Sequence, residues 1–336
     1  MRLAVTGSIA TDHLMAFPGR FTDHLLPDRL DRISLSFLVD TLEVRRGGAA
    51  ANIAFGLAGL GLTPLLVGAV GGDFAEYEVW LKDHGVDTGG VRVSADRGTA
   101  RFLCVTDQDA NQIAAFYTGA MAESRTIDLR DVVARCGTVD LVLVSPGDPE
   151  AMLRHTEQCR TLGLAFAADP SQQIARLDGT ALRRLVDGAR WLFTNEYEAA
   201  LLLERTRWTR QAVLERVGAW ITTCGARGVR IDRSGHPELT VPAVPAPRVA
   251  DPTGAGDAFR AGFLWAVAQD LPQLSAAQLG CALAALALET VGPQTYRLGA
   301  RRLHDGVKTA YGTQAAPLLA ALARHPPPRP RQRSIR

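Results

Sequence analysis

Residues 251–259 read DPTGAGDAF and have the composition of an anion-binding turn with a base at its edge. The glycines at 254 and 256 permit the positive φ angles that let successive backbone N–H groups converge on one point. An apolar, helix-periodic segment follows, and the N-terminus of such a helix directs its dipole toward the same point. Asp257 would then lie beside bound negative charge. Phosphoryl transfer to an alcohol requires this pairing of a base with an anion pocket.

A helix N-cap is the alternative interpretation of Asp257, because Asp is a favoured capping residue. Capping explains that one side chain but not the nine-residue pattern. The segment resembles the second signature of the PfkB, or ribokinase-like, carbohydrate and nucleoside kinases. The resemblance implies that Asp257 is the catalytic base, which an ordinary Asp pKa of about 3.9 would keep ionised. It also implies that the transferred phosphoryl group is stabilised by Thr253, Gly254, Ala255 and Gly256.

The composition is that of a soluble globular enzyme. Of the 336 residues, 47% are hydrophobic and 21% are charged, and the length favours about two domains or one large α/β domain with an accessory part. No apolar run approaches the roughly 18 residues that would span a bilayer, and the N-terminus lacks a hydrophobic region of signal-peptide length. We therefore expect a cytoplasmic protein without a membrane partner.

Cysteine and charge patterns exclude further classes. The five cysteines are scattered without a C-x-x-C pair, which predicts reduced thiols and neither a disulfide framework nor a zinc site. The positive charge is concentrated in residues 325–336, which hold four arginines and no acid. We expect this basic Pro/Arg tail to be disordered, with a polyproline ligand as the alternative. The rest of the chain has no basic excess, so no nucleic-acid partner is expected.

Short apolar runs alternate with helix-periodic segments along most of the chain. Buried strands are expected at residues 3–8, 65–70, 141–145, 164–168 and 191–194. Helices are expected at 50–60, 74–84, 149–162, 196–204, 257–268, 275–291, 300–311 and 315–323. This order predicts an α/β fold with a doubly wound, mostly parallel sheet flanked by helices.

Two segments, residues 13–46 and 92–117, depart from the alternation and have more β-type patterns. The ribokinase-like resemblance implies that they form a small β-sheet lid over the acceptor site, leaving residues 1–12, 47–91 and 118–324 as the large kinase domain. In many family members the lid also mediates dimer contact, so a homodimer through the lid is expected. Ordinary edge hairpins are the alternative.

Two further segments resemble parts of the acceptor site. Residues 47–54, GGAAANIA, resemble the family's first signature; Gly48 would let a ligand approach the backbone, and Asn52 offers a sugar hydroxyl both a donor and an acceptor. A tight turn with a cap is the alternative. Asp12 follows the first expected strand, where open α/β sheets bind ligands. The resemblance implies that it holds the 2′- and 3′-hydroxyls of a ribose, and an Asx-turn is the alternative.

Residues 195–198, NEYE, match the family's N-x-x-E pattern. The resemblance implies that Asn195 lies beside the ATP phosphates and that Glu198 organises Mg²⁺ and its waters, which suits the preference of Mg²⁺ for oxygen ligands. A solvated helical Glu is the alternative. Residues 223–228, TCGARG, resemble a turn that borders the ATP site in the family, with contacts from Thr223, Gly225 and Gly228.

Missing motifs exclude two other nucleotide-binding classes. The chain has no G-x-x-x-x-G-K-[ST] motif, and its two lysines, Lys82 and Lys308, lie far from any Gly-rich turn. A P-loop kinase is therefore excluded. No strict G-x-G-x-x-G follows a strand with a downstream acid, which argues against a dinucleotide dehydrogenase.

The acceptor is predicted from the lid. Phe102 and Phe116 are placed where a planar base could stack, although both could equally be core residues of the lid. Residues 5–14, 34–39 and 168–173 resemble the bacterial adenosine kinases of actinobacterial type, and the similarity extends to about residue 323. The resemblance implies that the adenine is surrounded by Ser8, Ser36, Phe102, Phe116, Gln172 and Gln173, with ribose held by Asp12, Gly48 and Asn52.

We therefore expect an adenosine kinase that transfers the γ-phosphoryl group of Mg-ATP to the 5′-hydroxyl of adenosine. The resemblance also implies activation by K⁺ near the anion turn. A ribokinase- or fructokinase-type sugar kinase is the first alternative. A nucleoside-binding regulator without catalysis is the second, and the presence of Asp257, Asn195 and Glu198 argues against it.

Overall fold

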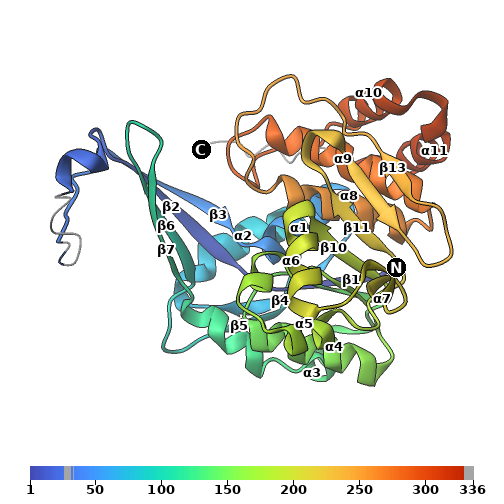
Figure 1. The fold of residues 1–336 in the computed structure, drawn as a ribbon, viewed down its shortest axis with the longest axis horizontal. Helices are drawn as coiled ribbons and strands as arrows, with labels where there is room; N and C mark the ends of the chain where they lie inside the picture. The colour runs from blue at the N-terminus through green and yellow to red at the C-terminus, as the bar shows by residue number, and fades with distance from the viewer. Residues whose placement is uncertain (26–31, 33, 329–336) are drawn as a thin grey trace.

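A nine-stranded sheet and a separate four-stranded sheet organise the chain (Figure 1). The structure, a computed structural model, describes residues 1–25, 32 and 34–328. The large sheet has the order β13-β12-β11-β10-β9-β8-β1-β4-β5. Its strands are β1 (Leu3–Thr6), β4 (Leu65–Val70), β5 (Asp87–Val93), β8 (Leu141–Val144), β9 (Ala165–Ala168), β10 (Trp191–Asn195), β11 (Trp220–Thr223), β12 (Val229–Asp232) and β13 (Leu239–Val241).

The strand order places a topological switch point at β1. Strands β4 and β5 extend the sheet on one side of β1, and β8 to β11 extend it on the other, all in parallel. Only the edge strands β12 and β13 pair in antiparallel. The expected doubly wound, mostly parallel sheet is confirmed. Ligands of such sheets bind beyond the carboxyl ends of the strands at the switch point.

Helices cover both faces of the large sheet, because successive strand residues point to opposite faces. On one face, Leu3 and Val5 pack with apolar side chains of α1 (Ala49–Gly59), α2 (Ala75–Asp83), α8 (Ala255–Ala268), α9 (Gln273–Leu288), α10 (Ala300–Tyr311) and α11 (Ala316–Arg324). On the other, Ala4 and Leu65 pack with α3 (Leu129–Cys136), α4 (Pro149–Leu162), α5 (Gly179–Val186), α6 (Glu196–Thr206) and α7 (Arg210–Leu214). Each face therefore has its own apolar core.

Helix α8, which carries Asp257, is largely enclosed. Its residues 258–267 are all buried, and it packs against α1 and α9. Two glycines allow this close approach: a Cβ at Gly262 would lie 2.7 Å from the carbonyl oxygen of Leu279, and one at Gly280 would lie 2.7 Å from the Phe259 ring. The packing holds the N-terminus of α8, and with it Asp257, in one position.

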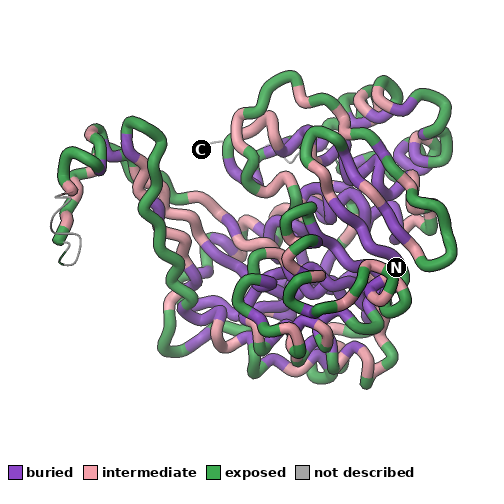
Figure 2. Tube along the Cα trace, in the orientation of Figure 1, coloured by how far each residue is buried: buried purple, intermediate pink, exposed green. Residues whose placement is uncertain are grey.

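The small sheet has the order β3-β2-β6-β7 and projects from the body (Figure 1). Its strands are β2 (Ala10–Ala16), β3 (Thr41–Gly47), β6 (Ala100–Thr106) and β7 (Gln112–Tyr117), which we call the lid. Much of the lid surface is exposed, whereas most strands of the large sheet are buried (Figure 2).

The C-terminal tail is described only to residue 328, and the expected disorder of residues 329–336 lies outside the described residues. Pro327, in the described part of the tail, is buried. Among the residues with described structure, no helix combines the length and hydropathy needed to cross a membrane.

The α8–α9 contact should tolerate no added methyl group. We expect Gly262→Ala to lower the free energy of unfolding by about 1–3 kcal/mol, because the new Cβ meets backbone atoms of Leu279 and Gly280 that cannot rotate away. Gly306→Ala, in the interior of α10 with nothing within 4 Å of the new Cβ, should be neutral or stabilising by up to about 1 kcal/mol. Urea unfolding measures both, and equal midpoints for the two variants would contradict this packing.

Candidate functional site

The predicted anion-binding turn forms the N-terminus of α8. Gly254 caps the helix with a φ of 80°, in the left-handed region, and a Cβ there would lie 2.4 Å from Cβ of Pro293. Glycine is therefore required at this position for both conformation and space. The first N–H groups of a helix have no partner within it, so this end of α8 can bind an anion.

Asp257 lies in the first turn of α8 and faces α1. The Asn52 amide donates a hydrogen bond of 2.8 Å to Asp257 Oδ2. Burial raises the pKa of Asp257 above its ordinary value, and the bond from Asn52 and the positive charge of Arg260 oppose that rise. The sequence-based expectation of an ordinary pKa is thus not what the structure shows. A carboxylate with a raised pKa is a stronger base while it remains ionised.

A chain of hydrogen bonds orients Asn52. Gln294 Nε2 donates to Asn52 Oδ1 at 2.9 Å and to the Tyr77 hydroxyl, which donates to the carbonyl oxygen of Gly47 at 2.9 Å. Trp80 Nε1 donates to Gln294 Oε1 at 3.2 Å. Gln294, Tyr77 and Trp80 were not among the predicted site residues, because the contacts of Gln294 with Asn52, Tyr77 and Trp80 each span more than 200 positions and follow no spacing rule.

Three predicted site residues and one charged residue lie in one cross-strand row of the lid: Asp12, Phe102, Phe116 and Arg45. Asp12 in β2 lies opposite Arg45 in β3 and opposite Phe102 in β6, and Phe102 lies opposite Phe116 in β7. Directly opposite residues point to the same face of a sheet. The fold therefore brings the predicted ribose ligand and both predicted stacking rings to one face, with 46% of Phe116 exposed.

Burial raises the pKa of Asp12 to about 6; the charge of Arg45 opposes the rise, and Asp251 and Asp257 add to it. The influence of Asp257 on this carboxyl group indicates that the row of the lid and the N-terminus of α8 belong to one site.

Ser8 and Gly48 stabilise the local backbone conformation, Ser8 by a hydrogen bond and Gly48 by its positive φ angle. Ser8 is buried, and its Oγ accepts the N–H of Ala49 at 2.9 Å. Gly48 has a φ of 92°, and a Cβ there would lie 2.6 Å from the nitrogen of Ala10. The first signature thus lets the chain pass close to itself where β1 leads into the lid. The ligand contacts of both residues stay predictions.

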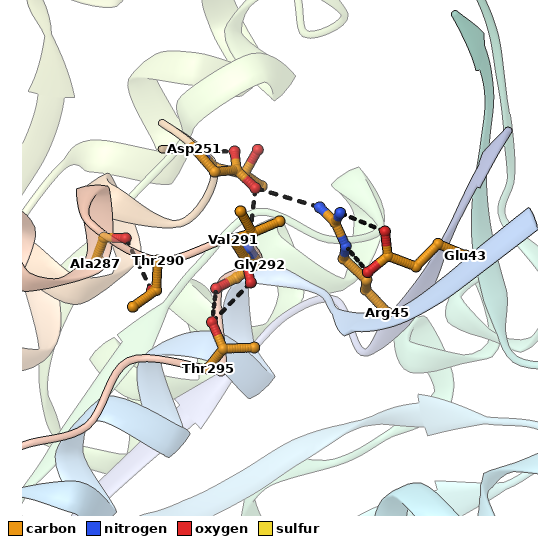
Figure 3. A network of polar contacts seen from close by, with 9 residues as sticks. Glu43, Arg45, Asp251, Ala287, Thr290, Val291, Gly292 and Thr295 are labelled. Atoms are coloured by element: carbon orange, nitrogen blue, oxygen red, sulfur yellow. Dashed lines mark hydrogen bonds and ion pairs between the residues drawn. The ribbon is translucent and has the colours of Figure 1, made fainter. Parts of the chain in front are cut away.

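A polar network joins the lid to the segment that enters the anion turn (Figure 3). Arg45 donates to both carboxylate oxygens of Glu43, at 2.7 and 2.6 Å, and a third nitrogen lies 3.4 Å from Asp251 Oδ2. Asp251 also accepts the N–H groups of Thr253 at 2.9 Å and Gly292 at 3.0 Å. A lid strand and the anion turn are therefore connected through one carboxylate.

The remaining predicted acceptor residues differ in exposure. Gln173 is buried and donates to the carbonyl oxygen of Gly147 at 2.9 Å. Gln172 is exposed, and its Oε1 accepts the Ser171 hydroxyl at 2.7 Å. Ser36 is exposed in a segment without regular structure. Of these three, Gln172 and Ser36 have side chains that an incoming ligand can reach.

Asn195 and Glu198 form a reciprocal cap at the start of α6. Asn195 Oδ1 accepts the N–H of Glu198 at 2.8 Å, and Glu198 Oε2 accepts the N–H of Asn195 at 2.7 Å. The second oxygen, Oε1, lies 3.3 Å from the Ser171 hydroxyl, which has its shorter contact with Gln172. In the described part of the chain, no three His, Cys, Asp or Glu side chains cluster as metal ligands. A metal here would depend on one carboxylate together with phosphate and water.

The predicted nucleotide turn follows β11. Thr223 Oγ1 donates to the carbonyl oxygen of Thr194 at 3.5 Å, and Gly225 and Gly228 have φ angles of 57° and 97°. A Cβ at Gly228 would lie 2.1 Å from the carbonyl oxygen of Val241. The turn is thereby held against the segment that follows β13.

A cavity of about 1030 Å³ lies between that segment and helices α9 and α10. Its apolar wall includes Pro242, Pro245, Pro247, Ala282, Ala285 and Leu286. The same segment continues directly into the anion turn at residue 253, so one stretch of backbone connects the cavity with the phosphate-binding helix end.

Other proteins resemble this chain in both sequence and fold. A nucleoside kinase of Methanocaldococcus jannaschii is 31% identical over 251 residues, covering 74% of this chain and 81% of that protein. A nucleoside kinase of Methanothermobacter thermautotrophicus is 32% identical over 272 residues, covering 80% and 86%. The solved structure of a Burkholderia thailandensis nucleoside kinase in complex with inosine has a TM-score of 0.81 and 36% identity, covering 92% of this chain and 98% of that one.

The signature segments form one site at the switch point of a doubly wound sheet, and the model of the pfkB family carbohydrate kinases matches residues 9–298. This chain belongs to the pfkB family of carbohydrate kinases.

Proposed function

We propose that this protein is a nucleoside kinase that transfers the γ-phosphoryl group of ATP to the 5′-hydroxyl of adenosine, giving AMP and ADP. One observation carries the proposal: Asp12, Phe102 and Phe116 share one row of the lid, and Asp12 is close enough to the half-buried Asp257, at an anion-binding helix end, for its pKa to be raised by that carboxylate. A carboxylate suits the vicinal diol of a ribose, and the rings suit a planar base.

The relatives support a nucleoside acceptor over a free sugar. The two relatives compared above are named nucleoside kinases, and the Burkholderia enzyme was solved with inosine bound. We propose adenosine as the preferred purine nucleoside because of the resemblance to bacterial adenosine kinases in residues 5–14, 34–39 and 168–173. The side-chain amide of Gln172, which has both a donor and an acceptor, would serve either purine.

In the proposed mechanism, Asp257 accepts the proton of O5′ as the bond to phosphorus forms. The N–H groups of residues 254–256 stabilise charge on the phosphoryl oxygens, because they are fixed before the reaction begins. Closure of the lid over the acceptor excludes water that would otherwise take the phosphoryl group. We place the ATP base in the apolar cavity beside residues 242–247, and the phosphates beside Asn195 and the turn at 223–228.

The residues present fit a magnesium ion that is held mainly by nucleotide and water. Glu198 offers one carboxylate, with one oxygen bound by the Asn195 N–H and the other 3.3 Å from the Ser171 hydroxyl, and Mg²⁺ in kinase sites typically keeps several waters. Bound there, Mg²⁺ would neutralise charge on the ATP phosphates.

We propose K⁺ as an activator near Asp251. We expect its effect to be weak, because a positive charge and hydrogen bonds already satisfy the oxygens of this region. Arg45 already places a positive charge 3.4 Å from that carboxylate, and the carbonyl oxygens of Val291 and Gly292 already accept the Thr295 hydroxyl at 2.8 and 2.9 Å (Figure 3). We expect replacement of K⁺ by Na⁺ to change the rate by less than about tenfold.

We also propose the cytoplasm, where ATP is available, as the site of action.

The acceptor assignment is tested by a panel of adenosine, inosine, cytidine, ribose and fructose with Mg-ATP. Adenosine should have the highest kcat/KM, and AMP should be the product. A higher kcat/KM for ribose or fructose would contradict the nucleoside assignment, and a higher value for inosine would contradict adenosine alone. Absence of transfer to every acceptor would favour a non-catalytic binding protein. Repeating the assay at varied Mg²⁺, and with Na⁺ in place of K⁺, measures both ion dependences.

Asp257→Asn should abolish most turnover, because the amide cannot accept the O5′ proton. We expect kcat to fall by about 10²–10⁴-fold while the fold is retained. The wild-type kcat/KM should also decline with acid at a pH above the ordinary Asp value, because burial raises the pKa of Asp257 and only its ionised form can act. Asp131→Asn, on the exposed surface of α3, is the matched control. Turnover by Asp257→Asn within tenfold of wild type would exclude this base.

We also propose that the lid mediates a homodimer. Met15, Leu42, Val105 and Ile113 form one row on the lid face opposite Asp12, with Leu42 60% and Ile113 46% exposed. Val44, on the same face, is 55% exposed. Another copy of the chain presents an identical apolar face, and pairing two such faces would remove both from water.

Leu42→Glu should convert the dimer to a monomer, because a buried interface does not tolerate an unpaired charge. Sedimentation equilibrium of wild type and variant measures the change. Val79→Glu, at a 50% exposed position on α2, should leave the dimer intact. A wild-type protein that remains monomeric at high micromolar concentration would show that this face does not pair two copies.

A further inference from the structure

A buried ion pair lies directly behind the anion turn. Arg260 follows Asp257 by one helical turn, and its side chain is 8% exposed. Its Nε and one terminal nitrogen contact the two carboxylate oxygens of Asp169 at 2.5 and 2.6 Å, and the Asp169 side chain is 1% exposed. The guanidinium lies 5.6 Å from the centre of the Phe193 ring in β10. The terminal nitrogen donates a hydrogen bond to Asp169, whereas Nε is close to the second carboxylate oxygen without hydrogen-bond geometry, so one directed bond and the ion pair hold the two side chains together.

The second terminal nitrogen of Arg260 extends the contact to the turn itself. It donates to the carbonyl oxygen of Gly256 at 2.9 Å. Gly256 is the last residue of the predicted phosphoryl-binding turn, immediately before the base. The guanidinium therefore constrains the peptide whose orientation determines where the N–H of Asp257 points.

Asp169 connects the pair to the other side of the site. It directly follows β9, where its N–H donates to the carbonyl oxygen of Val144 at 2.9 Å. The segment that begins at Asp169 continues to Ser171, Gln172 and Gln173, the proposed contacts of the acceptor base and of Glu198. One rigid pair thus joins the acceptor segment to the phosphoryl-binding turn.

Stability alone is a weak reason for this arrangement. Replacing a buried ion pair with apolar residues of similar volume is often neutral or stabilising, because desolvation of both charges offsets their attraction. Here the pair is placed between two functional segments, and Arg260 remains charged because a guanidinium does not lose its proton in proteins.

We propose that Arg260 and Asp169 are positioning residues, which hold the Gly256 peptide and the acceptor segment in the relative orientation that phosphoryl transfer requires. The inference rests on the proposed phosphotransferase activity and is independent of which nucleoside is preferred. Neither side chain contacts the reacting atoms; both act through the backbone of the turn and through the segment that begins at residue 169.

The decisive variant is the charge-free double substitution Arg260→Met with Asp169→Leu. It leaves no unpaired buried charge, so its unfolding midpoint in urea should stay close to wild type. Without the guanidinium the Gly256 carbonyl loses its side-chain donor, and kcat should fall by about tenfold or more, with a smaller change in acceptor KM. A kcat within about threefold of wild type in the folded double variant would overturn the inference.

Arg260→Lys gives a second measurement that does not depend on the double variant folding. Lysine keeps the charge but lacks the planar fork that contacts Asp169 at two points. We expect it to recover only part of the lost kcat, and full wild-type kcat would contradict the positioning role.

A pH profile separates positioning from charge. Arg260 is the charged group that lowers the pKa of Asp257. Asp257 in turn raises the pKa values of the neighbouring groups Asp12, Tyr77, Asp169 and Tyr296. The charge of Arg260 lowers the pKa of Asp257, so Arg260→Met should move the acid limb of kcat/KM to higher pH, whereas Arg260→Lys should leave it near wild type. An unchanged limb in both variants, together with unchanged kcat, would contradict any link between Arg260 and the site.

The control pair is Arg210 and Asp232, which contact each other on the far edge of the large sheet. Arg210→Met with Asp232→Leu removes another Arg–Asp pair, with side chains 35% and 10% exposed, and leaves Arg230 paired with Glu238; it should leave kcat unchanged. All rates are measured with an acceptor that the wild type phosphorylates. A wild type without transfer activity would refute the proposed function; an active wild type with an equally active double variant would refute only the positioning role.

Discussion

The site depends on one constraint: the half-buried carboxylate of Asp257, the proposed base, must stay ionised beside a helix end that is proposed to bind phosphate. Burial and a nearby anion both disfavour charge on Asp257. The amide of Asn52 and the guanidinium of Arg260 oppose this effect from two sides. The enclosed packing of α8 against α1 and α9 then keeps both partners at fixed distance. The raised pKa of Asp257 is the balance of these effects.

The lid is connected to this arrangement electrostatically. Arg45 lies opposite Asp12 in the lid and contacts Asp251, which in turn holds the N–H of Thr253 (Figure 3). A movement of β3 would therefore displace Asp251 and, through it, the backbone at the start of the anion turn. Acidic groups from the lid, the loop and α8 meet here, and Arg45 is the cation among them. This accounts for a pKa of about 6 at Asp12, which burial raises and Arg45 limits.

Much of the fold could be predicted because its signals are local. The expected strand at residues 65–70 and helices at 149–162 and 300–311 have the predicted bounds, since unbroken apolar runs and helical periodicity stand out between turn residues. Strands β11 to β13 and helices α3, α5 and α7 were not expected. The three strands are only three or four residues long, and pairing within the sheet stabilises them more than local sequence does. The three helices begin at the capping residues Asp128, Asp178 and Thr209, a local signal that the predictions did not use.

The sequence alone determined the family, the anion-binding turn and the identity of the proposed base, because glycine conformation and helix dipoles act over a few adjacent residues. Tertiary structure alone decided what surrounds that base. Gln294 and Asn52 form a hydrogen bond although they are 242 positions apart in the sequence, and Arg260 and Asp169 do so at 91 positions apart. No spacing rule predicts either contact. Desolvation and charge coupling depend on such distant neighbours. The direction of the pKa shift of Asp257 could therefore not be predicted from the sequence.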